Sequence, residues 1–285
     1  MHKVLPFPQL PLTEDDKPPY HSLDPIPQTA TFWTHNTCPN IGFRTQLMAT
    51  LNATPDSFSD GSMHNGLSAG LKYAKEAVSA GSTIIDIGGY STRPGAAHVS
   101  VEDEINRVIP FVKAIREFTD DDDPELAAKV RHILISVDTF RPEVAEAAVL
   151  AGANCINDVY AFTGKDSYDR SEEARLKGQQ IMQEMRRIAR KFATPVILMH
   201  SRGDAGKNTD YSMYHYAGQK EAILEGIRAE LGDKVNTAVT GPGAVRRWLV
   251  MVDPGIGFSK TVEGNLHTLR RASEITADKL IGEGQ

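Results

Sequence analysis

Polar side chains lie at or next to the ends of six short apolar segments of the chain, one for each segment. In chain order these residues are Asn52, Asp86, Asp138, Asn157, His200 and Asp253. A carboxylate that is removed from water needs a donor-rich ligand, a cation or a partner side chain to offset its desolvation. A flat ring such as a 2-amino-pyrimidinone offers adjacent N–H donors that one carboxylate accepts together, and an Asn amide can read a mixed edge. The residue types therefore indicate a pocket for a small donor-bearing ring.

The loop that begins at Asn52 and the loop formed by residues 88–95 favour a phosphate-bearing ligand. The side chain of Asn52 supplies a neutral oxygen, which suits a hard cation such as Mg²⁺ that keeps most of its waters. Residues 88–95 run Gly-Gly-Tyr-Ser-Thr-Arg-Pro-Gly, and Arg93 beside Thr92 suits an anionic group. We therefore expect a cation and an anion to meet at the same edge of the fold.

Strand-length apolar segments alternate with amphipathic segments of helix length from Gln46 onward. The expected strands are residues 47–51, 83–87, 133–137, 155–156, 196–199 and 249–252, and the expected helices lie near residues 67–78, 105–115, 142–148, 179–192, 218–231 and 262–275. Strands that are apolar on successive residues are typical of parallel sheets covered on both faces. The alternation predicts an α/β fold with a parallel sheet. Only six βα units are present, too few to close a TIM (β/α)₈ barrel, so either the barrel is truncated or the sheet is open. Polar groups at the carboxyl ends of barrel strands form the active-site rim.

The composition excludes several classes of protein. The chain has 285 residues, with 31 Lys and Arg against 37 Asp and Glu, and no long basic run, which argues against a nucleic-acid partner. Only Cys38 and Cys155 occur, so neither a disulfide framework nor a Cys-based zinc site is expected. No segment has the apolar length of a membrane span or a signal-type core. We expect a cytoplasmic protein, with a mitochondrial location as the alternative.

Five motifs together carry a resemblance to a known family. They are Asn52-Ala-Thr-Pro-Asp-Ser-Phe-Ser-Asp-Gly61, Ile85-Asp-Ile-Gly-Gly89 with Ser91-Thr-Arg-Pro-Gly95, Ser136-Val-Asp-Thr139, Asn157-Asp158, and Val252-Asp-Pro-Gly-Ile-Gly-Phe258. In this order they resemble dihydropteroate synthase, over residues 46 to about 276. The resemblance implies a pterin-binding TIM barrel that joins p-aminobenzoate to (7,8-dihydropterin-6-yl)methyl diphosphate, giving 7,8-dihydropteroate and pyrophosphate in folate biosynthesis.

The resemblance also implies a role for each matching residue. It makes Asn52 the Mg²⁺ ligand, Asp86 a carboxylate that supports the site, and Thr92 and Arg93 part of a loop over the substrate. Asp138, Asn157 and Asp253 would bind the pterin with Met199 as an apolar wall, and Phe258 would line the p-aminobenzoate side. Asp86, Arg93 and Asp138 are the expected catalytic residues, and a homodimer is the expected assembly.

Two motifs of the family are not found in the sequence. A Ser-Arg-Lys motif on strand seven and an Arg-x-His motif on strand eight would contact the pterin and the pyrophosphate. We therefore expect residues 46–285 to be a barrel truncated before strands seven and eight, of doubtful activity and poor solubility. Residues 1–45, rich in proline, are expected to be a tail or a linker from an upstream domain of a multifunctional eukaryotic enzyme.

Two other functions stay open at this point. A methyltetrahydrofolate-binding methyltransferase domain would have a similar barrel, although it lacks the two loops quoted above. A non-catalytic pterin-binding fragment is the other alternative.

Four further features have ordinary structural interpretations. We expect Asp120–Asp123 to be a solvated charge run, Glu104 to lie on a helix surface and Lys260 to face solvent. His200 is expected to bond to its neighbours rather than to a metal, since the nine His show no metal-binding spacing.

Overall fold

The computed structural model describes residues 37–38, 42–43, 45–53, 63–90, 99–166, 168–169, 171–218 and 221–276. Its main feature is a six-stranded parallel sheet in the order β3-β4-β5-β6-β7-β8. These strands are β3 (Met48–Asn52), β4 (Ile84–Gly88), β5 (Leu134–Asp138), β6 (Cys155–Asp158), β7 (Val196–Met199) and β8 (Val250–Asp253). Each strand pairs with the next one along the chain, as in a (β/α)₈ barrel, and the sheet does not close within the described residues.

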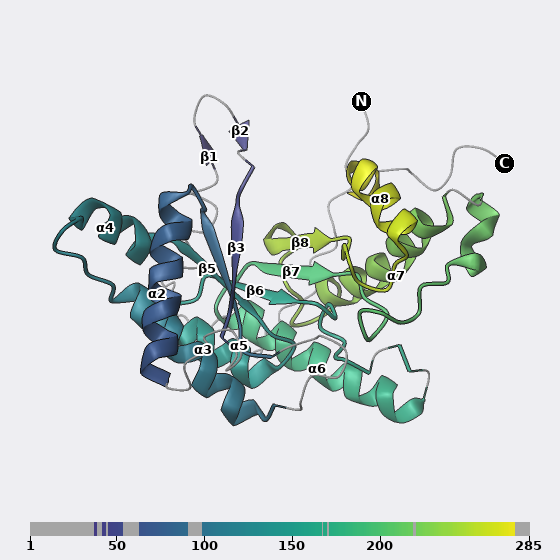
Figure 1. Cartoon of the computed structure of the whole chain (residues 1–285). Coiled ribbons are helices and arrows are strands. Elements are labelled where there is room, and N and C mark those ends of the chain that lie inside the picture. The colour runs from purple at the N-terminus through teal and green to yellow at the C-terminus, as the bar shows by residue number, and fades with distance from the viewer. Residues whose placement is uncertain are drawn as a thin grey trace, which may run out of the picture.

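Helices connect the strands and cover one face of the sheet (Figure 1). They are α2 (Met63–Ser79), α3 (Val101–Arg116), α4 (Pro124–His132), α5 (Pro142–Ala151), α6 (Glu172–Lys191), α7 (Ala222–Val239), α8 (Val262–Arg270) and α9 (Ala272–Thr276), with short 3₁₀ helices η4 (Ser212–Ala217) and η5 (Arg247–Leu249). The predicted α/β class and the six strands are confirmed.

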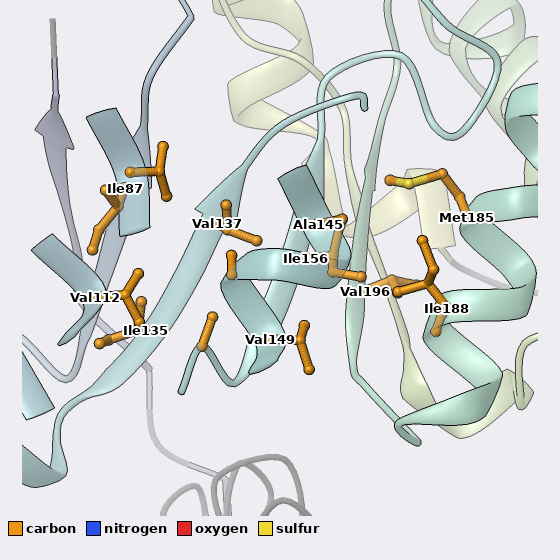
Figure 2. Packing of buried hydrophobic residues seen from close by; sticks show 14 of the residues in the cluster. Ile87, Val112, Ile135, Val137, Ala145, Val149, Ile156, Met185, Ile188 and Val196 are labelled. Atoms are coloured by element: carbon orange, nitrogen blue, oxygen red, sulfur yellow. The ribbon is translucent and has the colours of Figure 1, made fainter. Parts of the chain in front are cut away.

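A large apolar cluster covers one face of the sheet, and a small one covers part of the other face. On the helix-covered face, Ile135, Val137 and Ile156 pack against side chains of α3, α5 and α6 such as Val149 and Ile188 (Figure 2). On the other face, which we call the concave face, a smaller cluster fills the amino-terminal end of the sheet; its members are Ile84, Leu134, Cys155, Ile197 and Met251. Because successive side chains of a strand point to opposite faces, this cluster fixes which polar residues above it share the concave face.

Local sequence signals explain where the helices begin and end. Ser100 caps α3, because its hydroxyl accepts a hydrogen bond from the Asp103 amide at 3.0 Å. Pro142 occupies the first turn of α5, where no amide hydrogen is needed. The helix ends at Gly152, whose φ of 118° is easily reached by glycine alone.

The structure differs from the sequence-based expectation in three elements. Helix α4 lies where a loop was expected, and Asp123 of the acidic run is its N-cap. Helix α6 begins at Glu172, a full turn and more before the expected start, because Ser171 caps it. Two short paired strands, β1 (Thr37–Cys38) and β2 (Gly42–Phe43), lie within the segment expected to be a tail. None of the described helices combines the length and apolar character that a membrane crossing requires.

Candidate active site

Three of the predicted polar residues meet on neighbouring strands of the concave face. Asp138 at the end of β5 is in register with Asn157 of β6. Asn157 also reaches across to β4, where its Nδ2 donates to Oδ2 of Asp86 at 3.2 Å. Residues one or three places further along each strand point to the other face, so only this register brings the three side chains together.

Glycine leaves room for the Asp138 carboxylate. Gly88 pairs with Asp138 in the sheet, and a Cβ at position 88 would lie 3.1 Å from Oδ2 of Asp138. A side chain at that position would therefore press on the carboxylate. The Gly-Gly pair that ends β4 accordingly belongs to the site as well as to the turn.

The carboxylates of the concave face are poorly compensated. Burial raises the pKa of Asp86, and the negative charge of Asp253 adds to the effect. Burial likewise raises the pKa of Asp138 well above its usual range, and the carboxylates of Asp86, Asp158 and Glu104 raise it further. Hydrogen bonding from the side chains of Ser136 and Asn157 limits the rise at Asp86, whose Oδ1 has no hydrogen-bond partner within the described residues. The face therefore presents acceptors that a ligand rich in N–H donors would satisfy.

Asp253 and Met199 come from the last two strands. Met199 pairs with Asp253 in the sheet. Met199 also belongs to an apolar cluster with Phe140, Val159, Tyr160 and Phe258. One carboxylate oxygen of Asp253 accepts from the Gly255 amide at 2.7 Å, which fixes the direction of the carboxylate. The polar and the apolar parts of the predicted pocket are thus adjacent.

His200, the residue after β7, is held within the protein as expected. Its Nε2 lies 2.9 Å from a carboxylate oxygen of Glu230 on α7, and its side chain is buried. Arg202 binds the same carboxylate through Nε and Nη2, the latter at 2.6 Å. Burial lowers the pKa of His200 to about 4, so the ring is neutral at physiological pH. These contacts make His200 a structural residue and not a metal ligand.

Two residues expected at the surface are buried, and both expectations are wrong. Lys260 is 8% exposed, and its Nζ donates to the carbonyl oxygens of Gly255 and Phe258. Glu104 is fully buried because Arg141 pairs with it at 2.8 Å and the Thr139 hydroxyl donates to it at 2.6 Å. The residues around Glu104 in the sequence could not reveal that it is paired, since Arg141 lies 37 residues further along the chain.

The acidic run before α4 is solvated except at its first residue. Asp121, Asp122 and Asp123 are exposed, and Asp123 caps α4 through the Leu126 amide at 2.9 Å. Asp120 forms an ion pair with Lys75 of α2. The run lies at the amino-terminal end of the sheet, away from the concave-face carboxylates, and takes no part in the site.

The structure says less about the predicted metal ligand and about the loop predicted to bind an anion. Asn52 ends β3 with an exposed side chain, in register with Gly88. Thr92 and Arg93 fall outside the described residues. Within the described part of the chain, no group of three or more His, Cys, Asp or Glu side chains is arranged to hold a metal ion.

Comparison with known proteins decides between the two enzyme functions considered from the sequence. The profile of pterin binding enzymes matches residues 48–281. The chain belongs to the pterin-binding enzyme family. Within this family it stands with the dihydropteroate synthases, transferases of folate biosynthesis: it is 39% identical to the Clostridium beijerinckii dihydropteroate synthase over 85% of this chain and 75% of that protein. The methyltransferase alternative is therefore set aside.

Pterin-binding enzymes of other organisms agree with this placement. A mitochondrial bifunctional folate synthesis protein of Pisum sativum is 37% identical over 81% of this chain, which spans 39% of that protein. A dihydropteroate synthase structure from Clostridium difficile with pteroic acid matches with a TM-score of 0.61 and 31% identity, over 81% of this chain and 72% of that one. A Xanthomonas albilineans dihydropteroate synthase with 4-aminobenzoic acid matches with a TM-score of 0.59 and 31% identity, over 81% and 69%.

Proposed function

We propose that the concave face binds (7,8-dihydropterin-6-yl)methyl diphosphate and p-aminobenzoate and joins them as 7,8-dihydropteroate, releasing pyrophosphate. The observation that carries this proposal is the gathering of Asp86, Asp138, Asn157 and Asp253 on one face, where the pKa values of Asp86 and Asp138 are raised and Oδ1 of Asp86 has no hydrogen-bond partner within the described residues. A pterin ring offers adjacent N–H donors, and each carboxylate can accept two of them. The bound 4-aminobenzoic acid of the Xanthomonas enzyme supports the second substrate.

Asp138 is the residue proposed to act on the reaction itself. The bond between the pterin methylene carbon and the pyrophosphate oxygen breaks first, and the oxygen keeps the electron pair. The cation that remains is delocalised over the pterin and is offset by the Asp138 carboxylate, a preorganised electrostatic role. The amine nitrogen of p-aminobenzoate then forms the new C–N bond and releases a proton. Asp86 supports the site from the adjacent strand through Asn157.

The two ends of the substrate would be held by different parts of the rim. Met199 and Phe258 lie in one apolar cluster beside Asp253, which supports Met199 as a wall for the pterin and Phe258 as the p-aminobenzoate side. Thr92 and Arg93 are proposed to bind the pyrophosphate and exclude water, which would otherwise capture the cation.

Asn52 is proposed to contribute to a Mg²⁺ site beside the pyrophosphate. Its exposed amide at the end of β3 is one neutral oxygen, which fits an ion that takes its other ligands from phosphates and water. When bound, Mg²⁺ would neutralise charge on the departing pyrophosphate. Asn52 itself would orient that end of the substrate.

The assembly and the compartment are further proposals. Val262, Leu266 and Leu269 are exposed by 71%, 47% and 56%, and their spacing places them on one side of α8. This apolar stripe supports a homodimer, which light scattering tests. A cytoplasmic location is proposed from the scarcity of cysteine and from Cys155 being a buried free thiol.

Turnover with both substrates tests the proposed function. On the proposed function the unmodified chain forms 7,8-dihydropteroate and pyrophosphate in equal amounts, in a reaction that depends on Mg²⁺; such turnover would overturn the expectation of doubtful activity based on the two motifs that are not found. Asp138→Ala should remain folded and lose turnover. Binding of the pterin diphosphate without product formation would favour the non-catalytic alternative, and near-normal turnover by Asp138→Ala would remove Asp138 from the reaction.

A further inference from the structure

Lys260 is a buried lysine whose contacts all lie around one turn. The turn follows β8 and runs from Asp253 to Phe258. The ammonium donates to the Gly255 carbonyl at 2.8 Å and to the Phe258 carbonyl at 3.0 Å, and lies 3.2 Å from Nδ1 of His200. The Phe258 amide donates to the Gly255 carbonyl at 3.1 Å, so Lys260 closes the same turn from its inner side.

The turn connects Lys260 to both proposed substrate positions. The Gly255 amide holds the Asp253 carboxylate at 2.7 Å, while its carbonyl is held by Lys260. Phe258, whose carbonyl is also held, packs in the cluster that contains Met199. One ammonium therefore supports the orientation of a carboxylate on the pterin side and of a ring on the p-aminobenzoate side.

A second layer of charges holds Lys260 in this position. His200 is neutral and bonds to Glu230 through Nε2, which leaves Nδ1 to accept from Lys260. Arg202 and the Tyr214 hydroxyl complete the coordination of Glu230. Such a fully bonded network is rigid, and it keeps the ammonium from turning toward the substrate.

We propose that Lys260 is a positioning residue for both substrates: it holds the Gly255–Phe258 turn and thereby fixes the Asp253 carboxylate and the Phe258 ring. The proposal rests on the proposed function, since it assigns a support to residues that function uses. It differs from a direct contact with phosphate, because three acceptors of the protein already surround the ammonium.

Ligand binding to Lys260→Met tests this role. Removing the ammonium should weaken binding of the pterin diphosphate about tenfold or more, the usual effect of losing hydrogen bonds to a charged group. The alcohol 6-hydroxymethyl-7,8-dihydropterin, which lacks the diphosphate, should lose affinity by the same factor. The KM for p-aminobenzoate should rise as well. Lys260→Arg, which keeps a charged donor, should recover part of each loss.

Lys129→Met, at an exposed helix position whose ion pair is with Glu125 of the same helix, is the control and should change none of these values.

Two results would overturn the proposal. Unchanged affinities in Lys260→Met would show that the turn keeps its shape without the ammonium. A loss confined to the diphosphate ligand would show that Lys260 contacts phosphate directly. Failure of the unmodified chain to bind either pterin would instead reject the proposed function.

The amide resonance of Gly255 gives a test that needs neither ligand nor variant. Burial lowers the pKa of Lys260 to about 8; Asp253 on β8 and Glu230 on α7 oppose this effect, and Arg202 adds to it. His200 faces the ammonium from the end of β7 and titrates far below this range. Lys260 donates a hydrogen bond to the carbonyl group of Gly255. The NMR chemical shift of the Gly255 amide should therefore change with a midpoint near pH 8, as Lys260 loses its proton. A shift that stays constant from about pH 7 to about pH 9.5 would contradict the proposal.

Discussion

Asp138 illustrates how a binding residue can lower the stability of its own protein. The removal of this half-exposed side chain from water, together with the negative charges of Asp86, Asp158 and Glu104, raises its pKa well above the usual range. A folded-state pKa above the unfolded value means that the folded protein binds the proton more tightly, so stability is lost as pH rises above about 4. At neutral pH the charge therefore opposes folding.

Asp138→Asn should raise the melting temperature at pH 7 while removing pterin binding. A gain of ~1 kcal/mol corresponds to about 2–4 °C in a domain of this size. The gain should shrink toward pH 4, where the carboxyl group is protonated in the folded state and increasingly so in the unfolded state. Asp122→Asn, at an exposed position, is the control and should have no effect at either pH. A lower melting temperature for Asp138→Asn at pH 7 would contradict the electrostatic account.

His200 should make the protein sensitive to acid. Its pKa is about 4 in the folded state against about 6.5 when unfolded, so the stability it contributes is complete above pH 6.5 and is lost as pH falls toward 4. The loss is at most about 3 kcal/mol. Asp158, whose pKa burial raises to about 7, acts in the opposite direction, so the wild-type curve alone is not diagnostic.

The difference between the wild type and His200→Gln isolates this effect. We expect the wild type to be the more stable protein at pH 7, and its advantage to shrink on acidification between pH 6.5 and 4. Urea unfolding at several pH values measures it. An advantage that stays constant over this range would mean that His200 is not the responsible group.

Sequence could predict the concave-face residues but not the residues behind them. Asp86, Asp138, Asn157 and Asp253 each lie at or near the end of an apolar segment, and the common direction of parallel strands brings such ends together. Lys260 offers no comparable signal, because its burial depends on carbonyl groups of a turn whose conformation is set by contact with the end of β7. Its neighbours in sequence are polar, which is typical of a surface position.

The turn after β8 depends on one glycine, at the level of the structural element. Gly255 has a φ of 70°, and a Cβ there would overlap the carbonyl oxygen of His200. Gly257, two residues later, has a φ of 85°, and a Cβ there would meet nothing within 4 Å. The two positions share the backbone strain and differ only in the steric contact.

Gly255→Ala should therefore destabilise the protein far more than Gly257→Ala. The strain alone costs about 1–2 kcal/mol, which is the expected effect at Gly257. The overlap with a backbone atom adds to this, so Gly255→Ala should cost at least about 3 kcal/mol and weaken pterin binding through Asp253. Urea unfolding with matched m-values measures the two stabilities. Equal effects at the two positions would show that β7 and the turn are not in close contact.

The helices and strands differ in how well sequence predicts them. The strands are predictable to within a few residues because their apolar runs are continuous and short. Helix α4 is harder to predict because Asp120–Asp123 and Pro124 have the composition of a loop, although an Asp before a proline is also a good helix start. The sequence alone fits both a loop and a helix start, and only the structure shows that Asp123 is the N-cap of α4.

At the scale of the whole molecule, the fold gathers side chains from distant parts of the chain onto one face. Six strands pair in chain order, and the apolar cluster of Ile84, Leu134 and Cys155 sets the level above which polar residues begin. Alternation of apolar runs and amphipathic helices makes this arrangement predictable. The ionic network behind the face is not predictable, because it joins residues that lie far apart in the chain, after β7, after β8 and on α7.

Isothermal titration with the pterin diphosphate, in two buffers of different ionisation enthalpy, tests the central claim most directly. The account holds that the carboxylates of Asp86 and Asp138, whose pKa values are raised, accept N–H donors of the pterin. Binding should therefore release protons from the wild type, and Asp138→Asn should lose both the binding and the release. Binding of equal strength by Asp138→Asn would contradict the account, as would a wild-type heat that is independent of the buffer.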